Sequence, residues 1–495
     1  MKSIFTYLCL LGGALFCNSC EDYLSELPSK GANQPVTHID QLIGLLNNPN
    51  VRELDATGSF LTDDTGFTTE FYDEAYTFFS NSEPFYYYTF ETDKLASQAM
   101  DPLWTSLYAT IYNANLILEN ANEVEGDPDT KEQIKAEGHF LRAYSYWRLA
   151  NQYCLPYCEA NLNEPGLPLR KTTNMEESLV RSSLEETYRF IDEDLTEALK
   201  IKVTTTDQPW RVSQPTIQAF LSRYYLFRGE YEKAVSAADE ALKNAGRVQL
   251  KDYNSISAGM SFIPGFLEFP EMGNFTENQV VMWQEFFYAK TSGNIQSWYV
   301  PSEELLAHYD PTNDLRRRKL FTYNSMLLLP ETANGIFLGY NFFYWITPQI
   351  PSGVTIQEVM LNKAEALLRQ TNPAKDEALE LLYDLRKHRY DATAEEEIIR
   401  VEAATNDEAL KKVLEERRRE LPFTHRWFDI RRFAVNETAW DDVEITHSFY
   451  AITDGAVDRS QVKTYTLPVG SRRYAMPINE NDISASNGTI KQNEF

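Results

Sequence analysis

Apolar residues recur at helical spacing in several stretches of the chain, which predicts pairs of amphipathic helices. In the clearest stretch, residues 216–243, aromatic and small side chains stand at the offsets of a tetratricopeptide repeat, and Gly229 separates two helices. The matching positions are Leu221, Tyr225, Gly229, Tyr231, Ala234, Ala238 and Ala241. Small Ala side chains on the second helix allow close packing against the aromatic residues of the first.

Similar patterns recur elsewhere in the sequence. Residues 356–389 predict a second helix pair, with Pro373 at a position that suits a helix start. Residues 103–124 and 132–153 each predict an amphipathic helix, and the second has two apolar sides, so we expect it to lie between neighbours. Helix pairs are therefore expected near 103–153, 184–243 and 356–421.

Two long stretches, residues 50–100 and 245–350, lack this periodicity and are rich in Gly, Pro, Asn and aromatic residues. Irregular segments of this length are commonly functional when a rigid scaffold holds them. We therefore expect a mainly α fold, in which tetratricopeptide-like helix pairs form a superhelical scaffold that carries large irregular loop insertions. The expected organisation is a signal peptide at 1–19, an N-terminal helical region at 20–245, an irregular cap region contributing to binding at 246–350, and a C-terminal region at 351–495.

The first twenty residues have the pattern of a secretory signal. Lys2 precedes an apolar run from Ile4 to Phe16, and small and polar residues lead to Cys20. The run is too short to span a bilayer and resembles a bacterial lipoprotein signal, in which the Cys after a small residue is lipidated. This resemblance implies lipidation at Cys20; ordinary secretion with cleavage nearby is the alternative. The acidic pair that follows Cys20 resembles the export signal of Bacteroidetes surface lipoproteins, which implies the outer face of the outer membrane.

The charge balance excludes some partners. Lys and Arg total 46 and Asp and Glu total 73, so the net charge is −27. Nucleic acids and anionic lipid surfaces bind basic patches, so we expect no nucleic-acid partner and membrane attachment only through the lipid anchor. We also expect no cofactor and no metal, because the six His residues show no ligand spacing and no phosphate-cradling Gly-rich loop occurs. Cys154 and Cys158 are expected to be structural, either free or disulfide-bonded.

Aromatic residues make up 13 % of the chain and gather in the irregular stretches. A flat aromatic ring can cover the C–H face of a sugar while amide and charged groups hold its hydroxyl groups. The clusters lie at 71–90, 283–299 and 340–349. The candidate glycan-binding residues are Trp283, Trp298, Trp345, Tyr72, Tyr86, Asn81 and Tyr344. An ordinary packed aromatic is the alternative for each single ring, and we assign Trp104, Trp147 and Trp427 to the core.

A charged motif, ERRRELPFTHRWFDIRRF, surrounds Trp427. Glu416 and Glu420 stand one helical turn apart among several Arg residues, which predicts a salt-bridged structural corner rather than a catalytic centre. The abundance of acidic residues alone does not indicate the paired carboxylates of a glycosidase. We expect no catalytic residues.

Several segments together resemble the SusD/RagB outer-membrane glycan-binding lipoproteins of Bacteroidetes. The matching segments are 136–153, 216–243, 299–321, 358–388, 413–433 and 474–495. The sequence departs from the family in the PFTH connection before Arg426, which lacks the usual Glu-Gly pair, and at Cys154, where Gly is common. The resemblance implies a non-catalytic protein that binds oligosaccharide or polysaccharide and delivers it to a SusC-like TonB-dependent transporter. The alternatives are a peptide-binding, RagB-like uptake lipoprotein and, less favoured, a glycoside hydrolase.

Overall fold

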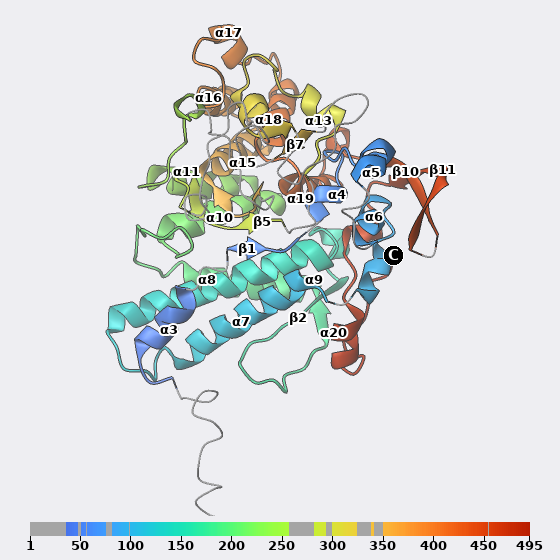
Figure 1. Cartoon of the computed structure of the whole chain (residues 1–495). Helices are drawn as coiled ribbons and strands as arrows, with labels where there is room; N and C mark the ends of the chain where they lie inside the picture. Colours follow the sequence, from blue (N-terminus) through green and yellow to red (C-terminus); the bar gives the residue numbers. More distant parts are fainter. Residues whose placement is uncertain are drawn as a thin grey trace, which may run out of the picture.

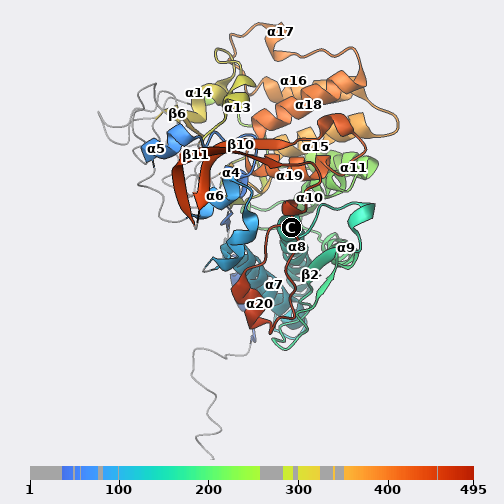
Figure 2. The same cartoon turned by 90° about the vertical axis from the view of Figure 1, so that its right-hand side faces the viewer.

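The computed structural model describes residues 36–47, 51–55, 57–75, 82–98, 100–256, 282–293, 299–323, 338–340, 350–453 and 455–495. Helices dominate and form two groups, one below the other in Figures 1 and 2. The lower group contains α3 (Ile39–Leu46), α7 (Pro102–Asn120), α8 (Pro128–Tyr153) and α9 (Leu184–Ala198). The upper group contains α15 (Ile356–Arg369), α16 (Lys375–Arg386), α17 (Glu396–Ile399) and α18 (Asn406–Glu420). Between them lie α10 (Gln214–Phe227), α11 (Tyr231–Lys243) and α19 (Thr424–Phe433).

The predicted helix pairs are confirmed. Helices α7 and α8, α10 and α11, and α15 and α16 pack against each other in sequence order. Gly229 connects α10 to α11 with φ of 72°, a conformation that favours glycine. The start of α16 differs slightly from the prediction, because the helix begins at Lys375, two residues after Pro373.

Local sequence explains where the main helices begin. The Asp101 carboxylate accepts the backbone N–H groups of Leu103 and Trp104 at the start of α7, and Pro102 occupies a position where no N–H is needed. Ser183 and Glu186 form a capping box at the start of α9, and Thr405 and Glu408 form another at α18. These caps satisfy backbone donors that have no partner inside the helix.

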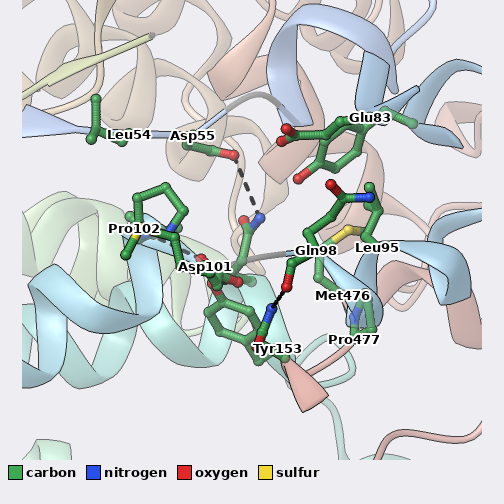
Figure 3. Close-up of a pocket in the computed structure, with 15 residues that line it drawn as sticks. Leu54, Asp55, Glu83, Leu95, Gln98, Asp101, Pro102, Tyr153, Met476 and Pro477 are labelled. Carbon is green, nitrogen blue, oxygen red and sulfur yellow. Dashed lines mark hydrogen bonds between the residues drawn. The ribbon is translucent and has the colours of Figure 1, made fainter. Parts of the chain in front are cut away.

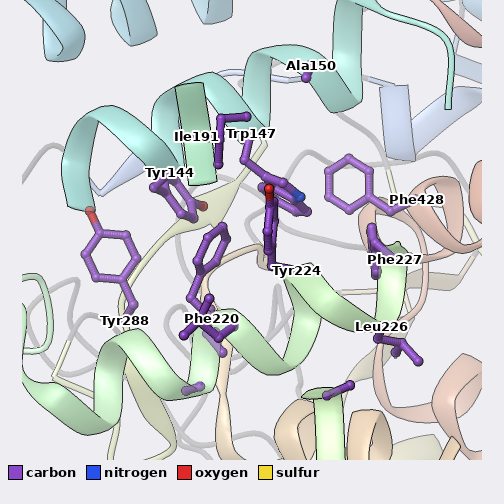
Figure 4. Packing of buried hydrophobic residues seen from close by; sticks show 14 of the residues in the cluster. Tyr144, Trp147, Ala150, Ile191, Phe220, Tyr224, Leu226, Phe227, Tyr288 and Phe428 are labelled. Carbon is purple, nitrogen blue, oxygen red and sulfur yellow. The ribbon is translucent and has the colours of Figure 1, made fainter. Parts of the chain in front are cut away.

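An aromatic core joins α8, α10 and α19 (Figure 4). Trp147 is fully buried, with ring centroids 5.4 Å from Phe220 and 6.0 Å from Phe428. This places α8 between neighbours, as its two apolar sides predicted. Trp104 and Trp427 are buried as well, so the assignment of these three Trp side chains to the core is confirmed.

The charged motif of residues 413–433 forms a buried network of ion pairs. Glu416 pairs with Arg386 at 2.6 Å and with Arg419 at 2.8 Å, and all three side chains are buried. Burial acts to raise the pKa of Glu416, but the guanidinium groups of Arg316, Arg419 and Arg386 outweigh it and hold that pKa well below its usual range. The prediction of a salt-bridged structural corner is confirmed.

The connection before α19 contains an uncommon backbone conformation. Phe423, before α19, has φ of 62°, which is uncommon for a residue with a bulky side chain. The Phe423 N–H donates to Asp64 Oδ2 at 2.8 Å. The Phe423 ring is buried, and its centroid lies 5.1 Å from the centroid of the Tyr299 ring. In the PFTH connection a Phe, held by these contacts, therefore adopts a conformation that usually requires Gly.

Short elements occur in the irregular stretches and elsewhere between the long helices. The helices are α4 (Thr57–Phe60), α5 (Thr69–Ala75), α6 (Glu83–Tyr88), α13 (Glu303–Ala307), α14 (Leu315–Lys319) and α20 (Glu480–Ala485). Strands β1 (Arg52–Glu53), β5 (Thr291–Ser292) and β8 (Ile350–Pro351) form a three-stranded sheet. The two-stranded pairs are β2 (Pro165–Pro168) with β3 (Arg181–Ser183), β4 (Phe286–Tyr288) with β9 (Val354–Thr355), β6 (Phe321–Tyr323) with β7 (Leu338–Tyr340), and β10 (Ile445–Thr453) with β11 (Ala456–Leu467).

One detail of the prediction needs correction. Residues 50–100 were expected to be irregular, yet Tyr72 lies on α5 and Tyr86 on α6. Because these helices span only two turns or less, they are too short to produce the apolar periodicity that identifies a longer helix.

Candidate functional site

An aromatic cluster forms where α5 and α6 meet the β10–β11 hairpin, at the right of Figure 1. We call it the cap cluster; it contains Phe60, Phe67, Phe71, Tyr72, Phe85, Tyr88 and Phe449. The Phe67 ring centroid lies 5.5 Å from Phe71, 5.2 Å from Tyr88 and 5.3 Å from Phe449. The cluster therefore joins segments that are more than 350 residues apart in the sequence, and it accounts for part of the high aromatic content.

Tyr72 lies at the polar edge of this cluster. Its half-buried ring packs edge-on against Phe85 at 5.3 Å, and the Arg459 guanidinium lies 5.3 Å from its centroid. The adjacent Asp73 accepts the Tyr450 hydroxyl at 2.7 Å and pairs with Arg459 at 3.2 Å. A partly exposed ring beside charged and hydroxyl groups is the combination that sugar binding uses.

Tyr86 lies on α6 and is nearly buried. Lys94 Nζ lies 5.3 Å from its ring centroid, and Lys94 pairs with Glu91 at 2.6 Å. The structure thus brings two of the predicted binding residues, Tyr72 and Tyr86, to the same α5–α6 segment. Tyr72 presents the more accessible ring.

Trp283 lies in a separate, buried group of side chains. It is 6 % exposed, and its indole N–H donates to Glu285 Oε2 at 2.9 Å. Glu285 in turn pairs with the buried Arg389 at 2.8 Å. Trp283 therefore occupies a core position here, and stacking on a sugar would require its ring to leave that position.

The remaining predicted site residues lie outside the described residues. They are Asn81, Trp298, Tyr344, Trp345 and the lipidation site Cys20. Their roles remain predictions.

A small cavity beside α6 gathers three carboxylates (Figure 3). Glu83, Asp55 and Asp101 line it, and Tyr153 donates its hydroxyl to Asp101 Oδ2 at 2.6 Å. Burial, with a further contribution from the Asp101 charge, raises the pKa of Glu83. The cavity volume of about 50 Å³ leaves room for water but not for a sugar ring.

A larger groove on α7 was missed by the sequence reasoning. Trp104, Tyr108 and Tyr112 line it at intervals of four residues, together with Met175, and its volume is about 520 Å³. The Trp104 and Tyr108 centroids are 4.7 Å apart, and Tyr112 is 42 % exposed. The signal was the spacing of four, which places these rings on one face of a helix. We call this surface the α7 groove.

The described residues show no sign of metal chemistry or of a membrane-spanning helix. Within these ranges, no group of three or more His, Cys, Asp or Glu side chains could hold a metal ion. No helix there is both long and apolar enough to cross a bilayer. Cys154 and Cys158 are free thiols, and burial raises the pKa of Cys154.

Two family models match the chain. Residues 25–226 match a model described as starch-binding associating with outer membrane, and residues 356–495 match the SusD family model. Neither description names a catalytic activity.

Individual proteins agree with these matches. A SusD-like protein P2 from Formosa agariphila is 26 % identical over 149 residues, which covers 30 % of this chain and 28 % of that relative. A SusD superfamily protein from Bacteroides thetaiotaomicron has a similar structure, with a TM-score of 0.61 at 20 % identity over 93 % of this chain and all of the other. A SusD-like carbohydrate binding protein from Bacteroides vulgatus gives a TM-score of 0.58 at 17 % identity, covering 91 % of this chain and 97 % of the other. At these identities the two structures show a shared fold.

Proposed function

Because the chain belongs to the SusD/RagB family, we propose that it captures an oligosaccharide or polysaccharide at the outer face of the outer membrane without cleaving it. The bound glycan then passes to a SusC-like TonB-dependent transporter, while the lipid on Cys20 holds the protein at the surface. The observation that carries the proposal is the agreement of both family models with a fold match over most of the chain.

The chemistry of the described residues supports binding rather than hydrolysis. A glycosidase needs two carboxylates that face one glycosidic bond across open space. The acidic side chains of the charged corner instead pair with buried Arg residues; Glu365 and Asp429 both contact Arg432, for example. The three carboxylates beside α6 surround a cavity too small for a sugar.

Aromatic rings near the cap cluster support a glycan as the ligand. Tyr72 offers a partly exposed ring next to Arg459 and Asp73. The predicted platform residues Trp298, Tyr344 and Trp345 belong to the two other aromatic segments of the sequence. We propose that these rings, with Tyr72 and Tyr86, stack on sugar faces, that the Asn81 amide holds sugar hydroxyl groups, and that Trp283 supports the surrounding structure.

The α7 groove supports a second candidate, a peptide ligand as in the RagB branch of the family. Its lining is largely apolar, and Met175 is 71 % exposed at its edge. Flexible, polarizable Met side chains adapt well to varied peptide side chains. The position of the bound ligand separates the two candidates.

A glycan array tests the proposal, using the protein from Glu21 onward together with a reducing-end assay on each glycan that binds. We expect retention of at least one polysaccharide with no new reducing ends. Trp345→Ala should weaken retention, whereas Tyr112→Ala in the α7 groove should not. Release of new reducing ends from a bound glycan would contradict glycan capture. So would a protein that binds only peptides and loses that binding in the Tyr112→Ala variant.

A further inference from the structure

A polar cleft of about 450 Å³ lies between α3, α7, α8 and strand β4. We call it the α3–α7 cleft. Helix α3 lies at the lower left of Figure 1, away from the cap cluster at the right. The lining residues are Leu45, Leu46, Ser106, Ala109, Thr110, Asn113, Ile117, Glu137, Leu141, Trp210, Val212, Tyr288 and Lys290. Clefts of about 300–1,000 Å³ commonly hold small molecules.

One buried hydrogen-bond donor at this cleft, the Trp210 indole N–H, lacks a partner in the described part of the chain, and the Tyr288 hydroxyl borders the same cleft. Tyr288 is 1 % exposed, and its ring packs edge-on against Phe140 at 5.2 Å and Tyr144 at 5.1 Å. Its hydroxyl extends away from the Phe220 side of the core in Figure 4 and makes no hydrogen bond to any described residue. The Trp210 indole N–H is buried and has no hydrogen-bond partner among the described residues. Buried polar groups are normally hydrogen-bonded, so the unpaired Trp210 N–H indicates that something polar binds beside it, where the Tyr288 hydroxyl can also reach.

Helix α7 adds neutral polar groups to the same cleft. Ser106 and Thr110 donate their hydroxyl hydrogens to backbone carbonyls one turn earlier in the helix, Leu103 at 3.1 Å and Ser106 at 2.9 Å. Their oxygens therefore remain available as acceptors toward the cleft. The half-buried Asn113 amide, which makes no hydrogen bond to any described residue, offers both a donor and an acceptor.

The acidic charge at the cleft is balanced by a neighbouring Arg. Glu137 accepts Arg211 Nε at 2.7 Å and a second Arg211 nitrogen at 2.5 Å, so its carboxylate is neutralised. Lys290 is 9 % exposed, and its Nζ lies 5.4 Å from the Tyr288 ring centroid. A purely apolar ligand would leave the Tyr288 and Trp210 donors unpaired.

We propose that the α3–α7 cleft binds one monosaccharide unit. A sugar ring carries hydroxyl groups that donate and accept at once, which matches a lining of neutral donors and acceptors. Its C–H faces would lie against the half-buried Trp210 ring and the apolar side chains of Leu45 and Ala109. This site is independent of the cap cluster and does not depend on the function proposed above.

The test uses ligand-observed NMR and calorimetry on the protein from Glu21 onward. The probes are D-glucose, D-galactose, D-mannose, D-xylose and D-glucuronate; the last of these reports on Lys290. We expect saturable binding of at least one probe. Tyr288→Phe removes only the hydroxyl group, and Asn113→Leu removes the amide, so each should weaken that binding about tenfold.

Tyr383→Phe is the matched control, because it also removes one hydroxyl group, on helix α16 and outside the lining of both the α3–α7 cleft and the α7 groove. It should bind the probe like the parent protein, and thermal melts should show that all variants are folded. If no probe binds saturably, the proposal is overturned. It is also overturned if Tyr288→Phe and Asn113→Leu bind the probe as tightly as the parent protein. Polysaccharide capture is measured in parallel: a protein that binds a monosaccharide here but retains no polysaccharide supports the cleft and contradicts glycan capture.

Discussion

Arg223 on α10 and Glu358 on α15 form an ion pair at 2.5 Å in which both side chains are completely buried. Arg223 also donates to the backbone carbonyls of Ser352 at 3.2 Å and Gly353 at 2.7 Å. Burial acts to raise the pKa of Glu358, but the Arg223 charge and hydrogen bonds lower it to about 2. This pair joins two helix pairs that are distant in sequence.

We predict that Glu358→Gln lowers the free energy of unfolding by about 3–5 kcal/mol, because it leaves the Arg223 charge buried without its counter-charge. Chemical denaturation followed by circular dichroism measures the change. The control is Lys200→Ala, which breaks an exposed pair with Glu197 and should cost about 0–1 kcal/mol. Similar losses in the two variants would contradict a special role for the buried pair.

Trp427→Ala should also destabilise the protein, by about 3–5 kcal/mol, because the indole is fully buried and its removal leaves a cavity. The matched control is Trp440→Ala, since Trp440 is 42 % exposed and contacts Lys411 at the surface. Thermal melting should show a much lower midpoint for Trp427→Ala than for Trp440→Ala. Equal midpoints would show that the corner does not depend on this ring.

Sequence reasoning found the helical scaffold because long helices repeat their apolar pattern over several turns. It also found the role of the charged corner, since alternating Glu and Arg on one helix predict ion pairs. It placed Trp283 on a binding surface, whereas the structure gives that indole a buried partner, Glu285, and a core position. Composition cannot tell a packed aromatic from an exposed one when tertiary contacts decide between them.

The two clefts were missed for different reasons. The α7 groove had a local signal, the interval of four between Tyr108 and Tyr112, but their exposure depends on residues near 175 and 485. The α3–α7 cleft had no local signal, since Asn113, Trp210 and Tyr288 come together only in the folded chain. Tyr288 also shows why rings within one sequence cluster differ, because it is a buried β4 residue.

The burial of His425 predicts that the folded protein loses stability as the solution becomes acidic. Both of its ring nitrogens are buried without hydrogen-bond partners, and burial lowers its pKa to about 4. In the unfolded chain a His has a pKa of about 6.5. As the pH falls from about 6.5 to about 4, the unfolded state binds a proton that the native state does not, so the free energy of unfolding should fall, by an amount on the order of 3 kcal/mol.

Urea denaturation at pH 7, 5.5 and 4.5 measures this dependence. His425→Leu cannot take up the proton, so its stability should fall less steeply over the same pH range. Trp440→Ala, which changes an exposed side chain that does not titrate, should keep the parent slope. Equal slopes for His425→Leu and the parent would assign the acid sensitivity to other groups, such as His447, whose pKa burial also lowers.

Lipidation is tested by Cys20→Ala. The apolar run ending at Ser19 and Cys20 predicts a lipid anchor, and several acyl chains bind a membrane firmly. The variant should move from the membrane fraction to the soluble fraction, whereas Cys158→Ala should remain with the membrane. Retention of Cys20→Ala would mean that another anchor holds the protein.

The aromatic platform gives the sharpest test of the glycan site. If sugar rings stack on Trp298 and Trp345, replacing either by Ala should cost about 1–3 kcal/mol of binding free energy, or roughly tenfold to a hundredfold in affinity. Tyr72→Ala and Tyr86→Ala should have smaller effects, because an indole covers more of a sugar face and its N–H can reach a hydroxyl group. Calorimetry with the polysaccharide found on the array measures each variant.

Trp283→Ala is the informative contrast, because its indole is buried and bonded to Glu285. If the indole is a packed core side chain, Trp283→Ala should lower the melting temperature. The protein that remains folded should then bind the polysaccharide with nearly the parental affinity. If Trp283→Ala instead stays stable and loses affinity, the ring must leave its core position to meet the ligand. If Trp298→Ala and Trp345→Ala both bind like the parent protein, the glycan lies elsewhere, and the α7 groove becomes the surface to test next.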